Sequence, residues 1–152
     1  MAQPKVISFG KGRLLLGDGA VPEVFVAPCG FTQGTLTFDK DTSDVTVPDC
    51  DDPDAAAWKA TDVTALGWSV SFQGVLAAES LPLYEKATFT SLATSVRLEL
   101  KGMGVGAGTP DKLYAGKGHV RMQINAQRGE KWQVQVDITG DGECVPSSIL
   151  IA

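Results

Sequence analysis

Four segments of the chain alternate strictly between apolar and polar residues, and this alternation constrains the fold more than any other feature. Successive side chains of a β-strand point to opposite faces, so each alternating segment predicts a strand with one buried face. A shift of one residue would turn every apolar side chain outward, so the register of each strand is well specified. The apolar members are Trp68, Val70 and Phe72; Val96, Leu98 and Leu100; Val120, Met122 and Ile124; and Trp132, Val134, Val136 and Ile138.

Shorter signals predict further strands and the turns between them. The segment Arg-Gly-Glu-Lys at 128–131 separates the last two alternating segments, which is typical of a β-hairpin. Residues 139–142 (Thr-Gly-Asp-Gly) predict another turn, before a final apolar stretch at 149–151. The remaining short strands are predicted at 14–16, at 24–26, around Leu36 and Phe38, and at 45–47, where Val45 and Val47 flank Thr46.

One helix and one long loop interrupt these strands. Ser80 is placed to cap a helix with Pro82 in its first turn, and Leu81, Tyr84, Thr88 and Leu92 follow with roughly helical spacing. Residues 54–59 could form one more helical turn. The glycine-rich segment from Gly102 to Gly118 predicts a long loop, and a loop of that length is usually functional or ordered by a partner.

These elements predict a single domain over residues 1–152, with an extended N-terminal segment. The fold class is mainly β: an antiparallel β-sandwich or barrel with one flanking α-helix and long loops. A chain of 152 residues buries roughly 70% of its unfolded surface on folding, so it needs no metal or disulfide for stability. Its composition, 43% hydrophobic and 20% charged with 17 glycines, suits a globular domain of short strands and tight turns.

Charge and cysteine content exclude several classes of function. The net charge of −5 argues against binding nucleic acid by neutralising phosphates. No apolar run approaches the ~20 residues of a membrane span, and no secretory signal is evident, so synthesis and assembly in a cytosol are expected. Cys29, Cys50 and Cys144 are widely spaced and His119 is the only histidine, so we expect reduced thiols rather than a zinc site.

Three segments resemble ligand-binding motifs, and each is better explained as ordinary structure. Gly116-Lys117 lacks the Ser or Thr and the following helix of a phosphate-binding loop. Asp137, Thr139, Asp141 and Gly142 match half of a calcium loop, but Ser148 stands where a bidentate Glu belongs. The acidic cluster Asp49, Asp51, Asp52 and Asp54 could hold a hard cation or contact a neighbouring subunit, although a solvated loop explains it more simply.

The sequence shows no recognisable set of catalytic residues. No nucleophile or carboxylate is paired with His119 by any motif, and no motif marks two carboxylates as a pair. We therefore predict that the chain is not an enzyme and assign no catalytic, cofactor-binding or metal-binding residue.

An ordered series of motifs resembles the tail tube protein family of long, non-contractile phage tails, over roughly residues 30–145. Residues 35–38 and 43–47 resemble the opening strand of that family, and Trp58-Lys59 with residues 63–74 resemble its tryptophan-containing loop and central strand. The helix near Pro82 has a counterpart, and residues 136–142 resemble the closing strand and turn. Ile138 departs from the family by replacing an aromatic residue, and residues 102–118 do not align.

The resemblance implies a structural virion protein with no cofactor. Family members form hexameric rings that stack into a hollow tube around a tape measure protein, and DNA passes through the lumen without specific binding. Implied partners are further copies of the chain, the tape measure, the tail terminator and the distal tail proteins; no membrane is involved. The implied location is the virion tail, assembled in the cytoplasm of a bacterial host. Lumen walls of such tubes tend to be acidic or polar, which fits the charge of −5 and the polar faces of the predicted strands.

The loops are expected to join the rings. We expect residues 39–59 and 102–118 to reach adjacent rings, and deletion of residues 104–115 to leave a folded monomer that cannot polymerise.

Two other functions remain open. A contractile tube would share the fold and differ only in binding a sheath. A β-sandwich module that binds carbohydrate or a receptor would need exposed aromatic residues; Trp68 and Trp132 lie on apolar rows and are expected to be buried, which leaves Trp58, Tyr84 and Tyr114.

Overall fold

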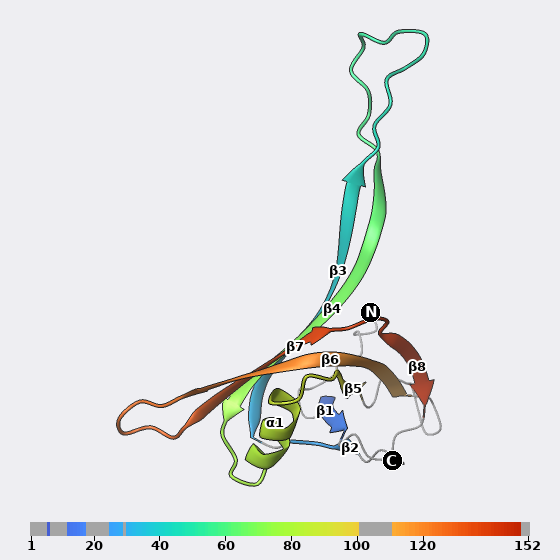
Figure 1. The fold of residues 1–152 in the computed structure, drawn as a ribbon. Helices are drawn as coiled ribbons and strands as arrows, with labels where there is room; N and C mark the ends of the chain where they lie inside the picture. Colours follow the sequence, from blue (N-terminus) through green and yellow to red (C-terminus); the bar gives the residue numbers. More distant parts are fainter. Residues whose placement is uncertain (1–5, 7–11, 18–24, 29, 101–110, 150–152) are drawn as a thin grey trace, which may run out of the picture.

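The computed structural model describes residue 6 and residues 12–17, 25–28, 30–100 and 111–149. Within these ranges the strands form one antiparallel sheet, in the order β2-β1-β5-β6-β7-β4-β3, and β8 pairs with the first part of β6 (Figure 1). The mainly β fold with one helix is therefore confirmed. The elements are β1 (Gly12–Gly17), β2 (Phe25–Val26), β3 (Phe31–Asp44), β4 (Thr61–Val75), α1 (Leu81–Thr88), β5 (Thr94–Leu100), β6 (Asp111–Asn125), β7 (Gln133–Gly140) and β8 (Val145–Ile149).

The alternating segments form the centre of this sheet, and their apolar side chains face one side. Strand pairing places Leu36, Val70, Ile138 and Val120 next to one another across β3, β4, β7 and β6. Val70 and Ile138 are almost fully buried. Because alternation determines which face a side chain occupies, the predicted core rows are confirmed in β4, β5 and β7.

The sheet curls until its two ends share one core. Leu14 and Leu16 of β1 belong to the same buried cluster as Trp68 and Phe72 of β4, although three strands separate β1 from β4 in the sheet. A flat sheet would hold these side chains well apart, so the curl is needed to bury them together. Burial of each large side chain of this kind contributes roughly 1.5–3 kcal/mol to stability.

Helix α1 closes the core on the apolar side. Tyr84 is completely buried on it and lies 6.0 Å, between ring centroids, from Phe31. The predicted helix is confirmed, with proline in its first turn; Ser80 stands at the N-cap position but makes no side-chain capping hydrogen bond. It ends at Thr88, before the predicted Leu92, which is exposed. Thr90 accepts a hydrogen bond from the Leu92 N–H through its hydroxyl, and such local bonds compete with a helix. Among the described residues, no helix is long and apolar enough to cross a membrane.

The predicted loop at 102–118 is wrong for its second half, because β6 begins at Asp111 and pairs with β5 and β8. Gly116 and Gly118 lie in this strand, where the absence of a side chain leaves room for side chains of neighbouring strands. A Cβ on Gly116 would lie 2.8 Å from the Trp68 ring, and one on Gly118 would lie 2.7 Å from Ile138 Cγ2. Residues 102–110 lie outside the described ranges. Deleting residues 104–115 would remove strand residues such as the buried Leu113, so that variant is no longer expected to fold.

A long hairpin leaves the body of the molecule. We call residues 39–66 the arm: the outer part of β3, the outer part of β4 and the residues between them, which together project beyond the body (Figure 1). Every arm residue is exposed except Thr46, which is half-buried. The helical turn predicted at 54–59 is absent. The strand predicted at 45–47 is also wrong, because β3 ends at Asp44. Beyond it, the Val45 N–H donates to the Ala60 carbonyl, and the Ala60 N–H donates to the Thr46 hydroxyl.

The end of the β6–β7 hairpin also differs from expectation. The hairpin itself is confirmed, with Gly129 at φ 85°, a conformation that glycine adopts readily. Trp132, predicted to be buried, is 56% exposed. It lies one residue before β7 begins at Gln133, so the alternating pattern continues past the part of the strand that the core covers.

Candidate functional site

The residues that resembled ligand sites do not gather into one. Among the described residues, no three His, Cys, Asp or Glu side chains are placed to hold a metal. Gly116-Lys117 lies within β6, and Asp137 in β7 accepts a hydrogen bond from Ser71 Oγ at 2.8 Å. The acidic cluster at 49–54 is exposed at the arm tip, where Asp49 Oδ1 accepts a bond from the Asp51 N–H, as in a local turn.

Among the described residues, His119, Cys50 and Cys144 show no catalytic arrangement. His119 Nε2 lies 3.7 Å from Asp141 Oδ2, and both side chains are more than half exposed, so solvent screens this pair. Cys50 is exposed at the arm tip, and Cys144 is partly buried; both are free thiols. Burial raises the pKa of the Cys144 thiol above its ordinary value of 9.0, which disfavours the reactive thiolate. Cys29 lies outside the described ranges.

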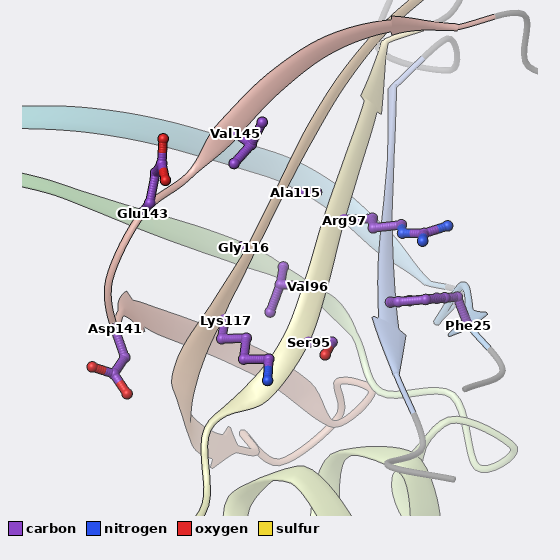
Figure 2. Close-up of a pocket in the computed structure, with 10 residues that line it drawn as sticks. All are labelled: Phe25, Ser95, Val96, Arg97, Ala115, Gly116, Lys117, Asp141, Glu143 and Val145. Carbon is purple, nitrogen blue, oxygen red and sulfur yellow. The ribbon is translucent and has the colours of Figure 1, made fainter. Parts of the chain in front are cut away.

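One hollow of the described surface lies where β5 and β6 meet β2 and the β7–β8 connection. It has a volume of about 610 Å³ and carries two basic and two acidic side chains (Figure 2). The Arg97 guanidinium stacks 3.9 Å from the centroid of the Phe25 ring at one side, whereas Asp141 and Glu143 lie at the other. These charges do not converge on one point, so this hollow has none of the geometry of an active site.

The polar face of the sheet carries regular rows of side chains. Strand pairing aligns residues in rows that cross β3, β4, β7 and β6: one row is Gln33, Gln73, Gln135 and Gln123. Gln73 Nε2 donates to Gln33 Oε1 at 2.6 Å, and Gln135 Nε2 lies 3.4 Å from Asp137 Oδ1. The next two rows are Thr35, Ser71, Asp137 and Arg121, and then Thr37, Ser69, Thr139 and His119.

This face is polar but nearly neutral. Across these three rows, Asp137 opposes Arg121, and every other side chain except His119 is an amide or a hydroxyl. The net negative charge of the chain therefore lies on other surfaces. No sequence pattern could show the rows, because a row exists only once the register between strands is known.

Two edges of the same four strands have no partner among the described strands. One is the outer edge of β3, and the other is the part of β6 from His119 to Asn125, because β5 pairs with β6 only as far as Gly118. The four strands β3, β4, β7 and β6 are successively antiparallel, so β3 and β6 run in opposite directions. The β3 edge of one copy could thus extend the β6 edge of another as an antiparallel pair.

The arm exposes apolar side chains that a second molecule would have to cover. Trp58 is 96% exposed, Leu66 is 73% exposed and Phe38 at the arm base is 54% exposed. Phe38 and Leu66 border a hollow of about 500 Å³ beside Trp68 and Cys144. A strand that carries such residues on an open edge is an aggregation hazard unless it has a partner.

Comparison with known proteins identifies a family for this arrangement. The sequence pattern of one family, described as phage tail tube protein, matches residues 9–145. The chain belongs to the phage tail tube protein family. A comparison with curated proteins found no match.

Solved structures of low sequence identity share the fold of this tail tube protein. A chain of the virion of a native gene transfer agent particle superposes with TM-score 0.71 at 12% identity, covering 93% of this chain and 99% of that one. The tail of an empty gene transfer agent particle, solved with C6 symmetry, gives 0.67 at 13%, covering 88% and 95%. The SPP1 tail tube gives 0.65 at 8%, covering 96% and 81%.

The family assigns a role to the chain. The chain is a structural tube subunit of a virion tail, as the resemblance in the sequence predicted. Residues 35–38, 43–47, 58–59 and 63–74, which carried part of that resemblance, lie in the β3–β4 hairpin. The parts that sequence reasoning missed are the open edges and the length of the arm, since both depend on which strands pair.

Proposed function

We propose that this tail tube protein forms rings of six copies, which stack into a hollow tube. The observation that carries this proposal is the pair of open edges, on β3 and on residues 119–125 of β6, at the two sides of one four-stranded sheet. Joining the edges head to tail repeats the same contact in every copy, and such a contact closes into a ring when the rotation fits. The C6 symmetry of a gene transfer agent tail of similar fold supports six copies.

The polar face of β3, β4, β7 and β6 suits the wall of the lumen. The opposite face packs into the subunit's own core, so closure of the sheet leaves the polar face to line one side of the ring. Rows of amides and hydroxyls with one balanced Asp137–Arg121 pair offer DNA neither clustered cations nor strong repulsion. The lumen would hold the tape measure protein and later conduct DNA without specific binding.

The place of assembly and the further partners follow from the proposed tube. Assembly takes place in the cytoplasm of a bacterial host and ends in a virion tail, with the tail terminator and the distal tail proteins at the two ends of the tube. The single domain acts through its surfaces rather than through catalysis. The arm, rather than residues 111–118, is the segment that reaches the adjacent ring.

The described residues give little support to the carbohydrate-binding alternative. Tyr84 is fully buried, and Tyr114 is partly buried against Phe38. Trp58 and Trp132 are exposed, but one lies on the arm and the other at the opposite end of the four strands. No stacking surface for a sugar ring forms from residues so far apart.

Negative-stain electron microscopy of the concentrated protein, alone and with a tail-tip complex as initiator, tests the proposal. Rings that stack into hollow tubes of uniform width are expected. Protein that remains monomeric in the presence of the tip complex contradicts the proposed function.

A further inference from the structure

The net negative charge of the chain comes from the arm. Residues 39–66 contain eight aspartates and two lysines, a net charge of −6, whereas the whole chain carries −5 and the rest of it therefore +1. All of these charged side chains are exposed. Like-charged arms repel one another, so the charge keeps free arms from pairing through their open β3 edges.

The turn that joins β6 to β7 has the opposite character. We call residues 126–132 the basic turn, because Arg128 and Lys131 outweigh Glu130 in it. Every residue of the basic turn is exposed, and Trp132 adds an apolar surface of its own. The rest of the described body, outside the arm and the basic turn, contains six basic and seven acidic side chains, a net charge of −1. The basic turn is therefore the part with an excess of positive charge.

The arm and the basic turn lie at opposite ends of the same strands. Strand β4 runs from the arm, at Thr61, to Val75, which pairs with Gln133 of β7; Gln133 in turn pairs with Asn125 of β6, next to the turn. In Figure 1 the arm and the β6–β7 turn accordingly project from different ends of the body. A copy displaced along the strand direction brings its basic turn toward the arm of the copy before it.

We propose that the acidic arm of one copy binds the basic turn of the next copy along the tube. This contact rests on the proposed tube and names the surfaces that join its rings. Opposite charges attract the two surfaces and set the head-to-tail direction of stacking. Contact then covers apolar side chains that each copy leaves exposed, Leu66 and Trp58 on the arm and Trp132 in the basic turn.

Charge reversal with compensation tests this contact. In the variant Arg128→Glu/Lys131→Glu, the basic turn repels the arm, and the critical concentration for tube formation should rise about tenfold or more. Asp41→Lys/Asp62→Lys should weaken assembly in the same way. Both aspartates are exposed arm residues. The chain that carries all four substitutions should recover tube formation.

The matched control changes the same charge elsewhere. Lys86→Glu/Lys117→Glu alters two exposed lysines of the body by the same amount and should assemble like the unaltered chain. Tube formation of the unaltered chain should weaken as salt screens the contact. Circular dichroism confirms that each variant is folded before assembly is scored.

Two outcomes separate the failure of this contact from the failure of the tube. If the unaltered chain forms tubes and the reversed turn forms them at the same critical concentration, the contact is refuted and the tube stands. If the fourfold variant is no better than either pair, the contact is likewise refuted. If the unaltered chain forms no tubes with a tail-tip complex, the proposed function itself fails.

Discussion

Gly140 of β7 lies directly against the indole ring of Trp68 in β4. A Cβ at position 140 would stand 2.4 Å from Trp68 Nε1 and 2.5 Å from Cε2, closer than non-bonded atoms approach. The Trp68 ring also covers Gly116 of β6. One buried side chain thus explains two glycines that interrupt otherwise regular strands.

Substitution of Gly140 by alanine should therefore destabilise the fold. The new methyl group forces the buried indole ring out of its position, which costs about 1–3 kcal/mol of unfolding free energy. Urea denaturation monitored by tryptophan fluorescence measures the loss. Gly67→Ala is the matched control, because a Cβ at Gly67 meets nothing within 4 Å; equal losses in both variants would contradict the explanation.

Shortening the arm should separate folding from assembly. Residues 48–57 at its tip are all exposed, and an Asn-Gly turn in their place can close the hairpin. The unfolding free energy should change by no more than about 0.5 kcal/mol, since no buried group is lost. Tube formation should disappear in electron micrographs, and a shortened chain that still forms regular tubes would exclude the arm as a ring contact.

The hydrogen bonds between Asp44 and Thr46 in the arm should be lost in acid. Hydrogen bonds from the Thr46 side chain, at 2.6 Å, and from the Thr46 N–H, at 2.9 Å, lower the pKa of Asp44 below its ordinary value of 3.8. A lowered pKa in the folded state means that the contribution to stability is present above pH 3.8 and is lost as the pH falls through the folded value.

An NMR titration of the Thr46 amide from about pH 6 to about pH 2 measures this change. Its midpoint should lie below 3.8 and should move up in Thr46→Val, which removes the hydroxyl donor. An unchanged midpoint in that variant would mean that the hydroxyl does not stabilise the carboxylate. The effect is confined to the arm, so the global unfolding transition should not follow it.

The two described thiols should react at different rates. Cys50 is exposed, whereas burial raises the pKa of Cys144 and so reduces its thiolate fraction at about pH 8. In a Cys29→Ser background, iodoacetamide should modify Cys50 several times faster, as mass spectrometry of the digested protein can show. Denaturant should abolish the difference, and equal rates in the folded protein would contradict the placement of Cys144.

The sequence by itself determined which residues of the central strands face the core. Alternation is local, since it depends only on the pleat of one strand, and it correctly placed Val70, Val96, Val136 and Ile138. Alternation failed for Trp132, because the pattern of one strand does not show where the core stops covering that strand. The order and spacing of the motifs along the chain also indicated the tail tube family, which the family match over residues 9–145 confirms.

Only the tertiary structure decided the surfaces on which assembly depends. Gly116 lies in a strand because it pairs with Val96 of β5, and the ring of Trp68, a residue distant in sequence, leaves room only for glycine there. The glutamine row, the open edges of β3 and β6 and the separation of the acidic arm from the basic turn all require knowledge of which strands pair and in which register. Pairing is a long-range choice made by the whole core, so no local pattern in the chain can specify it.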